Sequence, residues 1–187
     1  HRRRFADKVL AELRGVIDEA GGSPFWDAIA GRFFGMSFQE ADEFNAAHGT
    51  QFIADLMPKT PIYAAMLPES ARCVLGIPHP SGRAAMKMLE REGFSADGYV
   101  DIFDGGPTMA VATDQIRTIR ESRPFTLGAG NGTEDGQKVM LASGRLSGFS
   151  ACYGRMLPSR DKTAALDDES VRLLGIAPGD PFLSIGR

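Results

Sequence analysis

The sequence has few of the residues that build metal centres and disulfide scaffolds. Its 187 residues include only two cysteines, Cys73 and Cys152, and three histidines. The cysteines lie far apart and match no metal-ligand spacing, so neither a metal site nor a disulfide framework is predicted. Free cysteines are typical of a reducing compartment, and we therefore expect a cytoplasmic protein. The sequence also lacks a GxSxG motif, which argues against a serine hydrolase.

Long apolar runs and an excess of basic charge are absent as well. No stretch approaches the about 18 apolar residues of a membrane-spanning helix, and the first residues lack the apolar segment of a signal peptide. The formal net charge is -3 and the sequence pI is near 5.6, so the composition does not attract nucleic acid. We expect neither a membrane nor a nucleic acid as a partner. A hydrophobic content of 43% is sufficient for a globular core.

The stretch over residues 76–106 combines several strong local signals. It reads GIPHPSGRAAMKMLEREGFSADGYVDIFDGG. Pro80 excludes helical dihedrals for His79 and therefore holds it extended. Ser81 is expected to cap a helix, and a strand over residues 99–103 is expected to follow. His79 is thus presented from a stiff backbone and is our candidate for chemistry.

Elsewhere, alternation and capping signals predict a mixture of strands and helices. Alternating apolar residues predict a strand over residues 9–18, although a helical face also fits. Capping signals predict helices over residues 24–34 and 38–48, and residues 52–57 read as a strand. The sequence as a whole predicts an α+β fold.

The last third of the chain differs in composition from the rest. Residues 124–138 read PFTLGAGNGTEDGQK, which is rich in glycine and poor in apolar residues and therefore predicts a linker. Short strand signals and a helix near residues 168–174 follow, and they predict a small C-terminal β-barrel-like appendage. We therefore divide the chain into a domain over residues 1–123, the linker, and an appendage over residues 139–187.

Several ordered segments resemble one enzyme family. These segments are SPFWDAIAGRFF, FIADLMPKTPIY, the pair His79 and Pro80, MLEREGF and YVDIFDGGPT, and they span roughly residues 1–123. They are similar to the second half of the arginine N-succinyltransferases. The resemblance implies the second half of a GNAT-like acyltransferase fold, in which a mixed sheet is flanked by helices. Beyond residue 123 the resemblance weakens.

The resemblance implies an enzyme of arginine catabolism. Such an enzyme passes a succinyl group from succinyl-CoA to the α-amine of arginine or ornithine, with succinyl-CoA as acyl-donor substrate and no bound cofactor. His79 aligns with the family's catalytic proton donor. In the family, the loop and helix that hold the acyl-CoA pyrophosphate precede the position of His1, so we expect residues 1–187 alone to be inactive. We also expect a homo-oligomer.

Succinyl transfer defines which groups the site must contain. A neutral amine attacks the thioester carbonyl, an oxyanion forms, and coenzyme A leaves once its sulfur is protonated. We expect His79 to act as a shuttle that takes the amine's proton and later protonates the sulfur.

Substrate recognition calls for charged side chains. A guanidinium calls for a carboxylate, and a succinyl carboxylate calls for an arginine. Glu12 and Arg14 share a face of the first expected strand and are candidates, although a salt bridge between them or to a neighbour is the simpler explanation. Asp101 and Asp104 are alternatives, and hydrogen bonds within a turn explain Asp104 equally well. The other function that stays open is a non-catalytic fragment or subunit that binds arginine or a partner chain without acyl-CoA.

Overall fold

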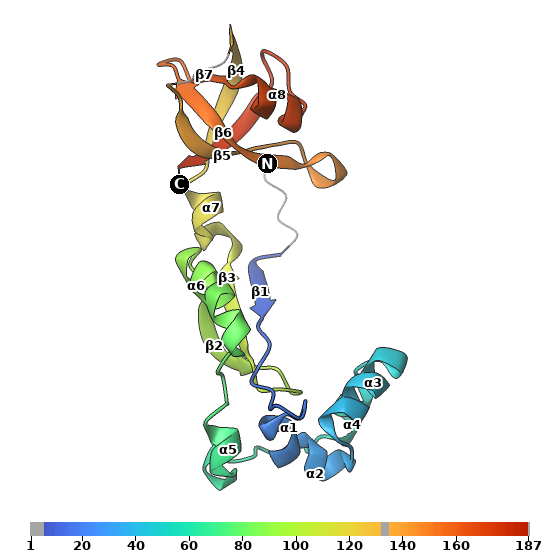
Figure 1. Cartoon of the computed structure of the whole chain (residues 1–187). Helices are drawn as coiled ribbons and strands as arrows, with labels where there is room; N and C mark the ends of the chain where they lie inside the picture. Colours follow the sequence, from blue (N-terminus) through green and yellow to red (C-terminus); the bar gives the residue numbers. More distant parts are fainter. Residues whose placement is uncertain (1–5, 132–134, 187) are drawn as a thin grey trace. The chain divides into compact units, whose positions relative to one another are not determined.

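A computed structural model describes residues 6–131 and 135–186 of the chain. It divides into two compact units, the first ending at Ile116 and the second beginning at Arg117. The first unit holds a three-stranded sheet and most of the helices, and the second is a closed barrel (Figure 1). The expected α+β class is confirmed.

The sheet of the first unit is antiparallel throughout. Its strands β1 (Lys8–Glu12), β2 (Ser95–Val100) and β3 (Pro107–Ala112) lie in the order β1-β3-β2. The strand expected over residues 99–103 forms earlier in the chain, since β2 ends at Val100. The expected mixed sheet is wrong for this unit, because the connection after β2 reverses the chain and β1 also runs against β3. β3 is the central strand and is buried along most of its length.

The helices before the sheet's second strand follow the capping signals closely. Ser23 caps α1 (Pro24–Ala28), which is separated at Ile29 from α2 (Ala30–Phe34). Ser37 and Glu40 form the expected capping box of α3 (Phe38–His48). These interactions join residues three positions apart, so they form as soon as the helix does.

The strand expected over residues 52–57 is wrong, because the chain forms helix α4 (Gln51–Leu56) there. The Gln51 side-chain amide donates to the Asp55 carboxylate at 2.9 Å along the helix. Phe52 meets the rings of Phe34 and Phe44 edge-on, at 5.5 and 4.9 Å between centroids. Packing against α2 and α3 therefore outweighs the strand preference of the aromatic and branched residues.

Trp26 joins these helices to the turn that follows β2. It is fully buried, stacks on Phe34 and Phe103 at centroid distances of 5.5 and 5.3 Å, and donates its Nε1–H to the Met36 carbonyl at 2.9 Å. A buried indole with its N–H satisfied makes a rigid anchor. The turn after β2 is thus held against α1 and α2.

The remaining helices of the first unit are short, except for the helix that follows His79. They comprise turns of 3-10 helix at Ala64–Met66, Pro80–Gly82 and Thr113–Gln115, together with α5 (Glu69–Arg72) and α6 (Arg83–Arg91). The expected Ser81 cap is wrong, because His79 itself caps the turn of 3-10 helix ahead of α6. In the part of the chain that the structure describes, no helix is both long and apolar enough to span a membrane.

The second unit opens with α7 (Arg117–Arg120) and continues as a five-stranded barrel. The barrel order is β4-β7-β6-β5-β8, closed by pairing of β4 with β8, and only β4 and β7 pair in parallel. The expected barrel-like appendage is confirmed. Its elements are β4 (Arg123–Asn131), β5 (Gln137–Ser143), a 3-10 turn at Leu146–Gly148, β6 (Ser150–Pro158), β7 (Thr163–Leu166), α8 (Asp168–Leu174) and β8 (Pro181–Gly186).

The expected linker is wrong over residues 124–131, because they belong to β4 and are part of the barrel. The expected boundary at residue 123 therefore also moves, since the second unit begins at Arg117. Added Cβ atoms on Gly128 and Gly130 would lie in ordinary contact with Ala164 and Ala165 of β7. Pairing with β7 and β8 satisfies the backbone of this segment, and composition alone does not reveal such pairing.

Candidate functional site

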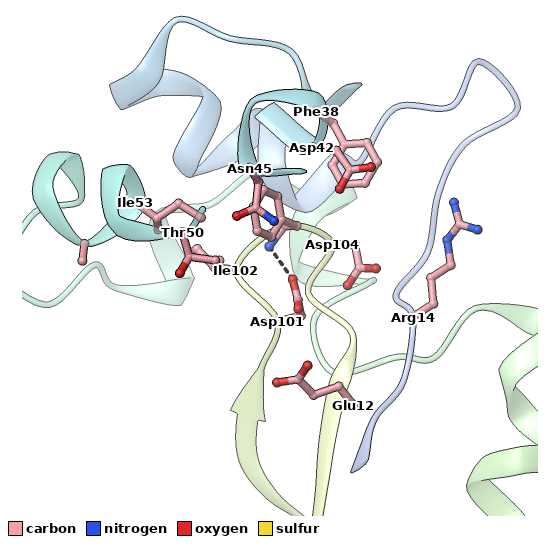
Figure 2. A pocket seen from close by; sticks show the side chains of 12 residues that line it. Glu12, Arg14, Phe38, Asp42, Asn45, Thr50, Ile53, Asp101, Ile102 and Asp104 are labelled. Atoms are coloured by element: carbon pink, nitrogen blue, oxygen red, sulfur yellow. Dashed lines mark hydrogen bonds between the residues drawn. The ribbon is translucent and has the colours of Figure 1, made fainter. Parts of the chain in front are cut away.

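The first unit contains an open pocket of roughly 900 Å³. Its lining comes from the end of β1 and the residues after it, from α3 and α4, and from the turn that follows β2 (Figure 2). Four carboxylates line it, those of Glu12, Asp42, Asp101 and Asp104, against one guanidinium, that of Arg14. The excess of negative charge favours a cationic ligand.

Gly15 and Gly106 allow two backbone segments to come close together beside the pocket, the segment after β1 and the turn after β2. A Cβ on Gly15 would overlap the carbonyl oxygen of Asp104, and a Cβ on Gly106 would overlap the carbonyl oxygen of Leu13. Only residues without a side chain permit this crossing. The crossing places the segment that carries Arg14 directly against the turn that carries Asp104.

The carboxylates of Asp101 and Asp104 are oriented by their own turn. Oδ1 of Asp101 accepts from the Phe103 N–H at 2.7 Å (Figure 2). Oδ1 of Asp104 accepts from the Gly106 N–H at 2.9 Å. The local hydrogen bond expected for Asp104 is therefore confirmed. Asp104 is only 8% exposed, and within the described residues it forms no ion pair. The Gly106 N–H thus fixes the orientation of the Asp104 carboxylate.

Glu12 and Arg14 both line the pocket, but they do not share a strand face. The strand ends at Glu12, and the chain then turns to form a bridge between Gly15 and Pro78. In Figure 2 the two side chains extend in different directions. Neither side chain forms an ion pair with a described residue. The salt bridge that was the alternative to a substrate-binding role for Glu12 and Arg14 is therefore not formed among these residues.

His79 lies beside the pocket lining and is not part of it. Its backbone N–H donates to the carbonyl oxygen of Arg14 at 2.7 Å, next to the bridge between Gly15 and Pro78. The side chain is half-buried. His79 is therefore fixed to the same backbone segment that carries Arg14.

The hydrogen bonds of the His79 ring indicate which nitrogen carries the proton. The backbone N–H of Ser81 donates to Nδ1 at 3.3 Å, and the Ser81 hydroxyl lies 2.7 Å from the same nitrogen. Nδ1 must therefore present a lone pair, which assigns the proton to Nε2. Among the described residues nothing hydrogen-bonds to Nε2. A ring with a single proton has to take up a second one before it can act as an acid, because loss of the Nε2 proton alone would leave an imidazolate.

Sequence reasoning missed the contribution of α3 to the pocket. Phe38, Asp42 and Asn45 follow the spacing of one helix face and all three line the pocket. The capping box predicts the helix itself. The spacing of Phe38, Asp42 and Asn45 is the sequence signal for the face of α3 that lines the pocket. The Asn45 Oδ1 atom is buried and has no hydrogen-bond partner among the residues that the structure describes. An acceptor of this kind is costly to leave unsatisfied.

The described residues hold no group of three His, Cys, Asp or Glu side chains placed to bind a metal ion. The free cysteines, Cys73 and Cys152, lie outside the pocket.

Comparisons with known proteins agree on one family. Residues 1–118 match the family model described as arginine N-succinyltransferase beta subunit. Two relatives from Pseudomonas aeruginosa PAO1 are named arginine N-succinyltransferase subunit alpha, 38% identical over 96% of this chain and 53% of the relative, and subunit beta, 46% identical over 75% and 41%. The solved structure of arginine/ornithine succinyltransferase subunit AI from Pseudomonas aeruginosa superposes with a TM-score of 0.79 and 34% identity, covering 97% of this chain and 52% of that one. The chain spans about half the length of the curated relatives it matches.

Proposed function

Because the chain belongs to the arginine N-succinyltransferase family, we propose that it serves an enzyme that transfers succinyl from succinyl-CoA to the α-amine of arginine. Ornithine is a second acceptor, as the name of the superposed structure suggests. The family match carries this proposal, since it spans both His79 and every residue of the acidic pocket. The reaction belongs to arginine catabolism and takes place in the cytoplasm.

His79 is the proposed proton donor of this reaction. The amine nitrogen bonds to the thioester carbonyl carbon, and the bond from that carbon to sulfur then breaks. The amine loses a proton to a base or a water molecule, and the departing thiolate receives one from the imidazolium form of His79, which is left as the neutral ring. Ser81 supports this role because its N–H and hydroxyl both lie at Nδ1 and fix the orientation of the ring. Glu12 and Arg14 remain proposed substrate-binding residues, Arg14 for a carboxylate group and Glu12 for a cation.

The proposal extends to the fold of the first unit and to the assembly of the enzyme. We propose that the antiparallel sheet and its helices form part of a GNAT-like acyltransferase fold. The Pseudomonas relatives are named as alpha and beta subunits, which supports an enzyme of several subunits. We propose that more than one copy of this chain takes part in it.

Replacement of His79 tests the proposed chemistry. In the intact enzyme, His79→Ala should lower kcat for coenzyme A release by about 100-fold or more, the usual scale for lost acid-base catalysis. The KM for succinyl-CoA and the thermal midpoint should change little, because the side chain is only half-buried. Turnover is measured by thiol titration of released coenzyme A.

His48→Ala is the matched control. His48 stacks on Phe44 at 4.3 Å on the exposed end of α3 and does not line the pocket, so turnover should be retained. If His79→Ala keeps its kcat and loses thermal stability, the histidine is structural. Arginine binding without any coenzyme A release would instead support the non-catalytic alternative.

A further inference from the structure

The hairpin formed by β5 and β6 carries large apolar side chains that are exposed to solvent. It extends to one side of the barrel unit (Figure 1). Leu146 at its turn is 77% exposed, and Phe149 and Tyr153 are 58% and 62% exposed. Phe149 and Tyr153 share the outer face of the hairpin by strand alternation, and Met140 lies opposite Tyr153 on that face. The described core of the barrel is built from other residues, so this surface is free to bind a partner.

The turn of the hairpin holds these side chains in a fixed arrangement. The Gly148 N–H donates to the Arg145 carbonyl at 3.0 Å, and the Phe149 N–H donates to the Leu146 carbonyl at 3.1 Å. A Cβ on Gly144 would overlap the carbonyl oxygen of Gly148, so the two ends of the turn are in close contact. Leu146 has a φ of 51°, which is unusual for a bulky residue. A surface that is already ordered loses little conformational entropy when it binds.

The charge of the hairpin indicates which kind of surface it binds. Residues 136–160 contain four basic residues, Lys138, Arg145, Arg155 and Arg160, and no Asp or Glu. Two hairpins packed face to face would therefore bring like charges together, which is unfavourable. The first unit has the opposite balance, because residues 1–116 contain 16 Asp and Glu against 11 Lys and Arg. The hairpin is thus complementary in charge to the first unit.

We propose that two copies of this chain associate through the β5–β6 hairpin, which docks on the first unit of the other copy. The proposal rests on the proposed assembly of more than one copy. Closed dimers have two-fold symmetry, so each copy supplies one hairpin and receives one.

The area of the hairpin surface agrees with such a dimer. A buried aromatic side chain covers roughly 150–250 Å², so the partly exposed Leu146, Phe149 and Tyr153 together supply roughly 400 Å². Because the contact is made twice, each copy buries about the 800 Å² of a standard interface. Tyrosine and arginine are also the residues that contribute most to binding at protein interfaces.

Sedimentation equilibrium of the full chain measures this association. Phe149→Ser and Leu146→Gly should each weaken the dimer about tenfold or more, the scale of an interface hot spot. Arg145→Glu should weaken it as well, and added salt should weaken the wild-type dimer because it screens exposed charges. At a concentration where the wild type is monomeric, the variants should keep its circular dichroism spectrum, since the replaced side chains are exposed and glycine tolerates the positive φ of Leu146.

Leu157→Ser is the matched control for lost apolar surface. Leu157 is 50% exposed and lies at the other end of β6 from the turn, so its dimer affinity should equal that of the wild type. A wild type that stays monomeric at its highest soluble concentration would overturn the proposal. A dimer of unchanged affinity in all three hairpin variants would overturn it too.

Photo-crosslinking identifies the surface that receives the hairpin. The chain with p-benzoylphenylalanine in place of Tyr153 is mixed with isotope-labelled wild type, so that mass spectrometry separates cross-links between copies from those within one copy. Cross-links to residues 6–116 of the labelled copy support the proposal. Cross-links to the hairpin of the labelled copy, or within one copy alone, would overturn it.

Coenzyme A release by the intact enzyme is assayed separately. Release by an enzyme that does not associate through the hairpin would overturn the interface and leave the proposed function intact. Association through the hairpin without any release would support the interface and overturn the proposed function.

Discussion

At the scale of single residues, the site depends on two glycines whose backbones cross. Gly15 and Gly106 each lie where a Cβ would overlap backbone atoms of the other segment. The crossing also positions His79, because its N–H donates to the carbonyl oxygen of Arg14, adjacent to Gly15. A side chain at either position would push the turn that carries Asp104 away from the segment that carries Arg14.

We predict that Gly106→Ala lowers the free energy of unfolding of the first unit by about 2 kcal/mol or more, because the backbone must move to admit the methyl group. Urea denaturation followed by fluorescence of Trp26, the chain's single tryptophan, measures the change. Gly82→Ala is the control, since its Cβ would meet its nearest neighbour, Pro78, at 3.8 Å. That variant should be unchanged or slightly more stable. Equal midpoints for the two variants would show that the crossing tolerates a side chain.

At the scale of elements, Asp167 connects a helix of the barrel unit to a strand. It caps α8 by accepting from the Ser170 N–H at 2.9 Å and also accepts from the Arg155 N–H of β6 at 2.6 Å. Burial raises the pKa of the Asp167 carboxyl, but the hydrogen bonds from Arg155 and Ser170 outweigh it and hold the pKa below its usual value. The carboxylate form therefore stabilises the folded barrel.

The sign of the pH dependence follows from this lowered pKa. Because the folded pKa lies below the unfolded value of about 3.9, the stabilisation is complete above that value and is lost as the pH falls through the folded pKa. Asp167→Ala should cost about 1 kcal/mol of stability at neutral pH, the usual effect of losing an N-cap. The difference from the wild type should shrink below about pH 4.

Chemical denaturation followed by circular dichroism, repeated from pH 7 to acid, measures both effects. Asp168→Ala removes a charge from the first turn of the same helix and should cost only a few tenths of a kcal/mol. A constant difference between Asp167→Ala and the wild type down to acid pH would contradict the assigned role of the carboxylate.

At the scale of the whole molecule, the second unit has a core of its own. Its buried residues come from every strand of the barrel and from α8, and they are Leu127, Val139, Leu141, Met156, Ala164, Leu166, Leu174 and Phe182. Closure of the barrel leaves no unpaired strand edge between β4 and β8. These features are those of an independently folding domain.

We predict that residues 117–187 fold when expressed alone. The fragment should show a dispersed amide NMR spectrum and a cooperative thermal transition. A fragment cut at residue 138, the end of the expected linker, would lack β4 and should remain unfolded, because the barrel would then be open along β7 and β8. Cooperative folding of that shorter fragment would show that β4 is dispensable.

The sequence by itself determined two kinds of feature. One kind depends on contacts between residues close together in the chain, and the other is the family to which the chain belongs. The cap at Ser23, the capping box of Ser37 and Glu40 and the helix over residues 168–174 depend on hydrogen bonds between near neighbours, so their signals lie within a few residues. The family resemblance rests on motifs that follow one another in order on both sides of His79. These motifs are contiguous and need no knowledge of the fold.

What only the tertiary structure decided depends on residues that lie far apart in the sequence. β4 forms because Arg123 pairs with Ser184, and α4 forms where aromatic packing outweighs strand preference. The pocket gathers Glu12, Asn45 and Asp104 from three separate segments. Glycine crossing, ring stacking and strand pairing act through space, and a single sequence does not specify which distant residues they will join.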